Sequence, residues 1–443
     1  MPTRPATSVH NQLVQATSQT DPIAPRTWVA IDIAKGVNVA LVEHADGRQQ
    51  RFRFVHQRED YDRLVAFLKD CSGPCRIALE PTADYHRTVA FRLVSEGFDL
   101  VLVSSVAGAR LREAVFNSWD KNDPKDAQVI LRLLKQGMTQ RYFDPLIVQT
   151  HDLQELSKTY LHISRARTRL QHVLLTHYLT LYFPEIERFW STQRNEWFIR
   201  LLLQFPTPAS ITACSLEEFR AAIWKSMGRR VHKEAKIAEI YALAQRTIAL
   251  PIPSSSPAAT TFRLQLERYL QLCEVRDALE SQADALLADS LDYQSLKSVP
   301  GVGSVIALVI LAEAGDLRRF AHHRQFLKFC GLDLAKSQSG AFRSREVLSK
   351  RGNARLRGAL WMAAMSAARM RENAFRDKYQ RYIARAPEDP DLKRKARTAV
   401  TAKMARVIYA VVKHGQPYRQ RFDADLPSGS IPLRRAVEAF GTS

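Results

Sequence analysis

The stretch Thr27–His56, TWVAIDIAKGVNVALVEHADGRQQRFRFVH, decides the fold of the N-terminal part of this chain. It contains three strand-like runs, which span 27–35, 37–45 and 48–56. The first two are apolar and rich in β-branched residues, and in the third Phe52 and Phe54 alternate with polar residues. Asp46-Gly47 separates the second run from the third and is a hairpin turn signal, because glycine tolerates positive φ. The pattern predicts three strands joined by short turns.

Helices and strands alternate after this hairpin. We expect helices over 61–70 and 85–97, and strands over 75–81 and 98–105. Three hairpin-linked strands followed by alternating helices and strands predict a mixed α/β domain, which ends near Pro145.

The remainder of the chain is predicted to be mostly helical. Long apolar stripes at helical spacing run over 151–183 and about 261–291, and they favour an antiparallel pair or a coiled coil used for dimerisation. The segment between them is less regular, and PIPSSSPAA at 251–259 is typical of a linker. The predicted organisation is a tail at 1–26, an α/β domain at 27–145, a helical connector at 146–292 with an insertion at about 184–260, a C-terminal domain at 293–424 and a tail at 425–443.

Composition points to a polyanionic partner. The 443 residues carry a formal net charge of +20, which exceeds what solubility needs, and 46% of them are hydrophobic, as in a folded protein. No apolar run approaches the roughly 20 residues that a membrane span requires, so nucleic acid is favoured over membrane. The five cysteines are irregularly spaced, as expected for reduced thiols of a cytosolic protein.

Four carboxylates occupy positions that suggest a metal site. Asp32 lies inside the first strand, Glu80 ends the fourth, and Asp123 and Asp126 lie three residues apart where a helix begins. Clustered carboxylates repel one another, and hard divalent cations such as Mg²⁺ relieve that repulsion. Taken singly, Asp123 is more often a helix cap and Asp126 a first-turn partner of the helix dipole. The set of four favours a Mg²⁺ site for phosphoryl transfer.

Three segments carry a resemblance to a known family. AIDIAK, ALEPTADYH and KNDPKDA resemble the DEDD, RuvC-like (RNase H-like) nuclease domain of the insertion sequence 110 family of transposases. The resemblance implies that Asp32, Glu80, Asp123 and Asp126 are the catalytic, metal-binding carboxylates. The family usually has threonine before the first aspartate of the last pair, where this chain has Asn122.

The C-terminal half resembles the same family. SVPGVGSVIALVILAEAGD is similar to the opening of its transposase domain, and Gly301 and Gly303 form a turn whose backbone N–H groups either approach a phosphate or simply make a helical corner. GLDLAKSQSGAFRSREVLSKRGNARLRGAL follows, and the family's catalytic serine maps onto Ser339. Ser337, Ser344 and Ser349 are neighbouring candidates. The predicted phosphate-binding cations, which are otherwise a solvated helix face, are Arg343, Arg345, Lys350, Arg351 and Arg355.

The resemblance implies a DNA transposase or recombinase of the bacterial cytosol or nucleoid. It implies donor and target DNA as substrates, Mg²⁺ as cofactor, and a bridge RNA that pairs with both DNAs. It also implies dimers, paired into a tetramer, in which carboxylates and serine from different subunits meet. Two other classes stay open. One is a metal-dependent, structure-selective nuclease such as a Holliday-junction resolvase, and the other is a non-catalytic nucleic-acid-binding protein.

Overall fold

The computed structural model describes residues 27–116, 123–191, 196–225, 233–335, 338–339, 342–343 and 346–420. The chain divides into two compact units, Met1–Gln149 and Thr150–Ser443. Arg345 and both predicted tails lie outside the described residues. For Asp123, Ser339 and Arg343 the description covers the backbone and not the side chain.

The first unit is built on a six-stranded sheet with the order β3-β2-β1-β4-β5-β6. The strands are β1 (Thr27–Asp32), β2 (Val37–Glu43), β3 (Gln49–Val55), β4 (Cys75–Leu79), β5 (Asp99–Val103) and β6 (Thr139–Arg141). Neighbouring strands β1, β4 and β5 are parallel, and the other pairs are antiparallel. The five predicted strands and the mixed α/β class are confirmed. The three-residue strand β6 was missed because it is too short to show a period.

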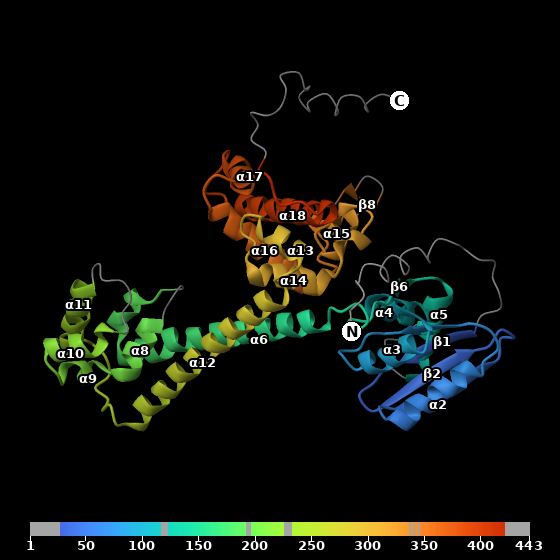
Figure 1. Ribbon diagram of the computed structural model, residues 1–443, viewed down its shortest axis with the longest axis horizontal. Helices are drawn as coiled ribbons and strands as arrows, with labels where there is room; N and C mark the ends of the chain where they lie inside the picture. The colour runs from blue at the N-terminus through green and yellow to red at the C-terminus, as the bar shows by residue number, and fades with distance from the viewer. Residues whose placement is uncertain are drawn as a thin grey trace, which may run out of the picture. The chain divides into compact units, whose positions relative to one another are not determined.

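Helices cover both faces of this sheet (Figure 1). They are α2 (Arg58–Lys69), α3 (His86–Ser95), α4 (Ser105–Phe116) and α5 (Asp123–Lys135). Successive side chains of a strand point to opposite faces, so Val29 and Ile31 of β1 pack with α2 and α3, whereas Ala30 packs with α4 and α5. This two-sided burial explains why β1 reads as a nearly continuous apolar run.

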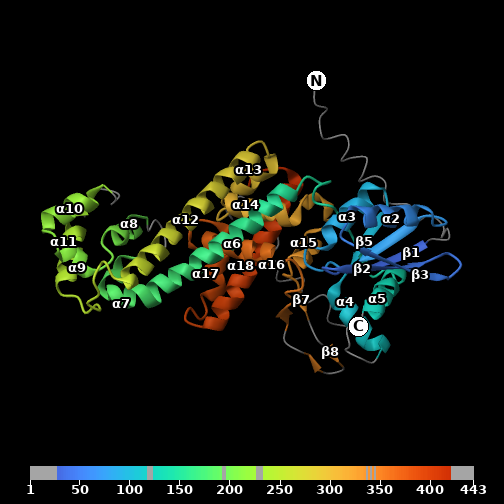
Figure 2. The same ribbon diagram turned by 90° about the horizontal axis from the view of Figure 1, so that it is seen from below.

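The second unit is dominated by two long helices that run side by side (Figures 1 and 2). The first comprises α6 (His151–Val173), a π-helical turn η1 (Leu174–Leu179) and α7 (Thr180–Tyr182), and the second is α12 (Pro257–Leu286). The Tyr160 hydroxyl donates to Glu280 at 2.9 Å, and the rings of Tyr178 and Phe262 stack with centroids 5.1 Å apart. These two contacts show that the helices are antiparallel. A coiled coil that joins subunits stays a prediction.

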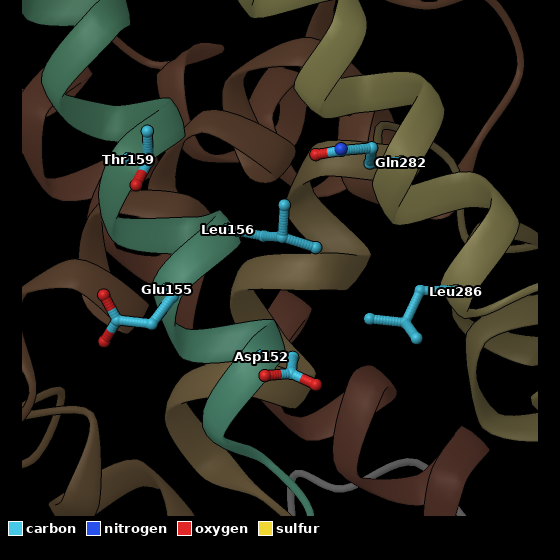
Figure 3. A pocket seen from close by; sticks show the side chains of 6 residues that line it. All are labelled: Asp152, Glu155, Leu156, Thr159, Gln282 and Leu286. Atoms are coloured by element: carbon cyan, nitrogen blue, oxygen red, sulfur yellow. The ribbon is translucent and has the colours of Figure 1, made fainter.

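A pocket lies between the first turns of α6 and the end of α12, and it is lined by apolar and polar side chains (Figure 3). Leu156 of α6 and Gln282 and Leu286 of α12 point into the space between the helices, whereas Glu155 points away from it. The pocket therefore combines an apolar floor with a polar rim.

The insertion between the two long helices has a core of its own. It contains η2 (Pro184–Phe189), α8 (Glu196–Gln204), α9 (Pro208–Thr212), α10 (Leu216–Trp224) and α11 (Lys233–Gln245), which pack against the η1 end of the pair. This segment is more regular than the sequence suggested. Ser215 and Glu218 form a capping box that starts α10, a sequence signal that marks a helix directly.

The C-terminal part of this unit surrounds one helical core. Its elements are α13 (Leu291–Lys297), α14 (Ser304–Ala314), η3 (Leu317–Arg319), α15 (His323–Phe329), β7 (Leu334–Ala335), β8 (Gln338–Ser339), β9 (Phe342–Arg343), β10 (Val347–Leu348), α16 (Ala354–Arg369), α17 (Ala374–Ile383) and α18 (Pro390–His414). The mostly helical class is confirmed. Within the described part of the chain, none of the helices has both the length and the apolar character that crossing a membrane requires.

Candidate active site

The parallel pairing of β1 with β4 brings two of the predicted carboxylates together. Ile31 is opposite Leu79 in the ladder, so the next residues along, Asp32 and Glu80, leave the two strands at the same edge of the sheet. Asp32 is on the same face as Ala30, and Glu80 is on the same face as Ala78, because side chains alternate. Both carboxylates therefore point to the side that α4 and α5 cover.

The Glu80 side chain approaches α4 at Gly108. A Cβ added to Gly108 would lie 3.5 Å from Glu80 Oε2 and 3.9 Å from Val129 Cγ1 of α5. Both distances are those of ordinary van der Waals contact, so the Glu80 carboxylate lies beside α4 at a place where α4 also approaches α5. The same helix packs on β1 and β4 and carries Asp126.

Asp126 is a buried carboxylate with one oxygen held and one left without a hydrogen bond. Its exposed fraction is 2%, and the Arg112 guanidinium of α4 donates to Oδ1 at 2.7 Å through Nε and contacts it at 2.5 Å through Nη2. Oδ2 is buried without a hydrogen-bond partner among the described residues. Leaving such an acceptor unpaired costs about 1–3 kcal/mol, so this oxygen is suited to a cation.

Sequence reasoning missed Arg112 and Gly108. They lie four residues apart on α4, so they share one face of the helix, and that spacing was the available signal. The Arg112 side chain is only 13% exposed, which makes its pair with Asp126 a largely buried ion pair. Breaking such a pair from one side leaves an uncompensated charge and typically costs about 3–5 kcal/mol.

The carboxylates fit a divalent cation by chemistry. Asp32 and Glu80 bring hard oxygen donors to the side of the sheet that α4 and α5 cover, and Asp126 Oδ2 offers an unsatisfied buried acceptor on α5. Among the described residues, no group of three or more His, Cys, Asp or Glu side chains stands close enough to hold a metal ion. Asp123 begins α5, but its side chain lies outside the description.

Replacing Arg112 by Met tests this geometry. We expect the free energy of unfolding in EDTA to fall by about 3 kcal/mol, because Asp126 is left buried and unpaired. Mg²⁺ should raise the thermal midpoint of the variant more than that of the unchanged protein, since the cation replaces the lost positive charge. The control is Arg110→Met, an exposed position on the same helix. Equal losses in the two variants, or equal responses to Mg²⁺, would contradict the assignment.

Ser339 lies on a small hairpin made of two short ladders. Leu334 and Ala335 of β7 pair with Leu348 and Val347 of β10, and farther out Ser339 of β8 pairs with Phe342 of β9. The structure therefore places the backbone of Ser339 in the outer of the two strand pairs. Arg343 follows on β9.

Two glycines fix the base of this hairpin against α16. Gly331 and Gly352 have φ of +67° and +151°, and a Cβ on Gly352 would lie 2.6 Å from the Gly331 amide nitrogen. Nη1 of Arg357 donates to the carbonyls of Cys330 at 3.0 Å and Lys350 at 3.2 Å. Arg357 therefore clamps both sides of the hairpin base, whereas Lys350 and Arg351 are exposed.

Arg355 borders a basic groove between α6 and α16. Its Nε contacts Oε1 of Glu313 at 2.6 Å, and the Asn353 side chain donates to Oε2 of the same carboxylate, which is 5% exposed. The groove has a volume of about 440 Å³ and is lined by Lys158, Leu161, His162, Arg165, Asn353, Ala354 and Arg355. Four of these side chains are basic, so the groove suits an anionic ligand.

Gly301 and Gly303 differ in their surroundings. Gly303 is the N-cap of α14, and a Cβ there would meet nothing within 4 Å. Gly301 has φ +83°, and a Cβ there would clash with the carbonyl oxygen of Ala363 and lie 2.7 Å from the Ala367 amide nitrogen of α16. Close packing on α16 is enough to explain Gly301, and a phosphate contact for either glycine stays a prediction.

Gly301→Ala is expected to destabilise the C-terminal core by about 3 kcal/mol, because both backbone strain and a backbone clash oppose the new methyl group. Gly358→Ala is the control. Gly358 is inside α16 with open space around it, so alanine should add about 0.5–1 kcal/mol of stability through helix propensity. Urea unfolding of both variants measures the difference. Gly301→Ala at wild-type stability would contradict the packing role.

Comparisons with known families place both halves of the chain. Residues 29–184 match the model of the DEDD transposase domain of IS110, described as "Transposase". Residues 293–380 match the model described as "Transposase IS116/IS110/IS902 family". The two matches together cover more than half of the chain and define a transposase with a DEDD domain. The chain belongs to the IS110 family of transposases.

Individual relatives agree with this family. The 44.8 kDa protein of insertion element IS116 from Streptomyces clavuligerus, named as uncharacterised, is 26% identical over 80% of this chain and 87% of its own length. The transposase for insertion sequence element IS1111A of Coxiella burnetii is 34% identical over 34% of this chain and 42% of its own length. The pilin gene-inverting protein of Moraxella lacunata is 26% identical over 30% of this chain and 40% of its own length. A DEDD transposase domain implies a bound divalent metal and DNA as substrate.

Proposed function

We propose that this protein cuts and rejoins DNA strands to move an insertion sequence, with a carboxylate cluster and a nucleophilic serine in one reaction. The observation that carries the proposal is the parallel pairing of β1 with β4, which brings Asp32 and Glu80 to one edge of the sheet, on the face covered by the helix that carries Asp126 with its open oxygen. The family membership adds DNA as substrate. The name of the Moraxella relative, a gene-inverting protein, is that of an enzyme that rearranges DNA.

Asp32, Glu80, Asp123 and Asp126 would hold Mg²⁺ in this proposal. When bound, the ion supplies positive charge against the reacting phosphate and its leaving oxygen. Arg112 holds Asp126 in place through Oδ1, while Oδ2 has no hydrogen-bond partner among the described residues. A cation held by the carboxylates would thereby offset their repulsion of the negatively charged phosphodiester.

Ser339 would be the nucleophile. Its Oγ loses a proton to a base or to water and forms a bond with the phosphorus, while the bond from phosphorus to the leaving sugar oxygen breaks and that oxygen takes up a proton. The second step reverses these changes with the sugar hydroxyl of another strand. One phosphoester bond replaces another at each step, so rejoining needs no external energy source.

Cations beside the serine would hold the DNA phosphates. Arg343 and Arg345 follow Ser339 in the sequence, and Lys350, Arg351 and Arg355 lie at the hairpin base and the groove. The turn amides at Gly301 and Gly303 are proposed as further phosphate contacts. Contacts with phosphates supply binding affinity, but they do not distinguish one DNA sequence from another, so sequence recognition requires another component.

A bridge RNA is the proposed source of sequence choice. Support comes from the family resemblance and from the net charge of +20, which suits two nucleic acids at once. RNA that copurifies with the protein should contain stretches complementary to the donor ends and to the target. A protein that copurifies without RNA and does not bind transcripts of the flanking DNA would overturn the guide.

Subunit contacts are proposed along α12. Leu264 and Val275 are exposed on this helix eleven residues apart, which places them close to one stripe. Such a stripe supports dimers that pair into a tetramer, in which the serine of one subunit meets the carboxylates of another.

A two-plasmid assay in cells tests the proposed activity. One plasmid carries the element with its flanking sequence and the other carries the target, and junctions are sequenced after expression of the protein. We expect accurately joined junctions. Broken plasmids without joined junctions would favour the nuclease alternative, and intact plasmids would favour a binding protein.

A further inference from the structure

Two segments of the C-terminal unit are free of acidic residues. No Asp or Glu occurs in 317–332, which includes α15, or in 392–420, which includes most of α18. The two helices pack on each other, and α17 packs on α18 as well (Figure 1). Their shared surface therefore collects positive charge with few carboxylates nearby.

Four cations of α17 and α18 form the centre of this surface. Lys378 and Arg381 are one turn apart on α17, and Lys403 and Arg406 are one turn apart on α18. The Lys403 ammonium donates to the Ala374 carbonyl of α17 at 2.7 Å, which holds the two pairs beside each other. Burial lowers the pKa of Lys378, and the charges of its neighbours lower it further. These neighbours are Arg406, Lys403 and Arg381.

The positive region continues onto α15. Partial burial and then His322, Arg406 and Arg324 lower the pKa of His323. Arg406 is thus near both His323 at the start of α15 and Lys378 of α17. Burial raises the pKa of Tyr418, and Asp377, the one acid of α17, raises it further.

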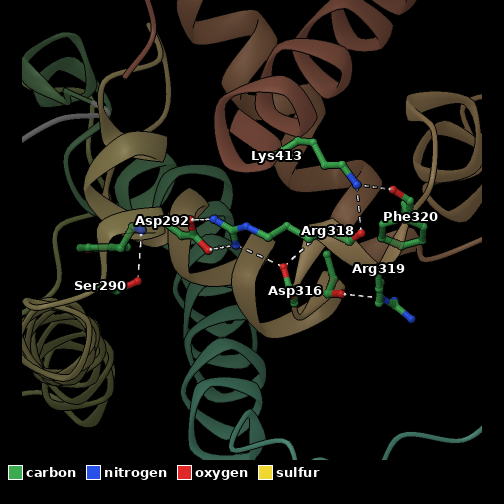
Figure 4. Close-up of polar contacts among 9 residues, drawn as sticks. Ser290, Asp292, Asp316, Arg318, Arg319, Phe320 and Lys413 are labelled. Carbon is green, nitrogen blue, oxygen red and sulfur yellow. Dashed lines mark hydrogen bonds and ion pairs between the residues drawn. The ribbon is translucent and has the colours of Figure 1, made fainter. Parts of the chain in front are cut away.

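Arg318, another cation of the C-terminal unit, has carboxylate partners, which sets it apart from Lys378, Arg381 and Arg406. Figure 4 shows Arg318 held by Asp292 in two contacts of 2.7 Å and by Asp316 at 3.2 Å. Lys413 donates to the carbonyls of Arg318 and Phe320. In contrast, no ion pair joins Lys378, Arg381 or Arg406 to a carboxylate anywhere in the described ranges. Like charges at this spacing repel, so the cluster costs stability in the free protein.

We propose that the α15–α17–α18 face, centred on Lys378, Arg381, Lys403 and Arg406, binds the phosphodiester backbone of a nucleic acid. Phosphates supply the negative charge that the surface lacks, and counterion release makes the binding salt-dependent. Lys403 and Arg406 lie beyond the C-terminal family match at 293–380, and no predicted site residue is on these helices. The proposal goes beyond the proposed function because binding at this surface does not depend on cleavage or joining of DNA strands.

The test compares full-length variants in EDTA, so that failure of the metal chemistry has no influence on the result. Lys378→Gln/Arg406→Gln removes two charges from the cluster. For duplex DNA or a folded RNA, we expect the negative slope of log Kobs against log salt concentration to become less steep by about 2. This corresponds to about 1 for each phosphate contact that is lost. The control, Lys393→Gln/Arg394→Gln, removes two charges of α18 that pair with Glu388 and Asp391. It should change the slope little.

The two polymers are measured in separate arms by fluorescence anisotropy. A change with duplex DNA alone identifies DNA as the occupant, a change with RNA alone identifies RNA, and a change with both indicates general backbone binding. Arg381→Gln/Arg406→Gln, at two exposed positions, repeats the test without altering half-buried Lys378. The thermal midpoint should not fall in either cluster variant, because repulsion is removed. Slopes equal to the wild type with both polymers would overturn the proposal.

Discussion

Asp126→Ala should abolish DNA cleavage while DNA binding persists. The side chain is buried and supplies the open oxygen through which a cation would be held. Several kcal/mol of transition-state stabilisation are lost without the cation, which corresponds to about a thousandfold or more in rate. Radiolabelled DNA ends, followed over time with Mg²⁺ present, measure the loss.

The matched control is Glu113→Ala, an exposed acid on α4 one residue from Arg112. It removes the same charge from the same region and should cleave at the wild-type rate. Calorimetry of Mg²⁺ binding gives a second measure that does not depend on turnover. Full cleavage by Asp126→Ala would show that the buried carboxylate only pairs with Arg112 and that the metal site lies elsewhere.

Ser339→Ala should eliminate both the covalent protein–DNA intermediate and the joined product. An alanine has no oxygen to attack phosphorus, so the expected loss is complete rather than partial. Denaturing electrophoresis of labelled DNA separates protein-linked strands from free ones. Folding is checked by thermal unfolding, since the serine is on the outer ladder of the hairpin and away from its clamped base.

Three neighbouring serines provide the comparison for Ser339. Ser337→Ala, Ser344→Ala and Ser349→Ala remove the same group within the same segment, and each should retain the protein-linked strand. Loss of the intermediate in one of these variants, with Ser339→Ala unaffected, would move the nucleophile to that position. Retention in all four variants would remove the serine mechanism and favour the metal-dependent nuclease.

The sequence predicted the strands that carry Asp32 and Glu80, but it did not show whether those two strands are neighbours. Asp32 in an apolar strand and Glu80 at the end of another become neighbours once β1 and β4 pair in parallel. The contacts of Asp126 were not predictable in this way. Its pairing with Arg112 depends on the packing of α4 against α5, and the approach of Glu80 to α4 beside Gly108 is also a long-range contact.

In the second unit, too, features set by local sequence were predicted, whereas contacts between distant segments were not. The long helices were readable from their apolar stripes, and the packing of α6 on α12 fits them. The insertion was underestimated, since short capped helices such as α10 carry little periodicity. The cation cluster on α17 and α18 also escaped notice, because charge runs in a sequence do not show which cations the fold brings close together.

The identity of the DNA-linked residue tests the central claim most directly. The wild-type protein is allowed to react with DNA carrying its element ends in the presence of Mg²⁺, the reaction is stopped with denaturant, and the protein is digested with protease and nuclease. Mass spectrometry of the peptides should then find a nucleotide phosphate on Ser339. DNA that is fully cut, with free phosphate and hydroxyl ends and no modified serine in the 334–349 segment, would contradict the account.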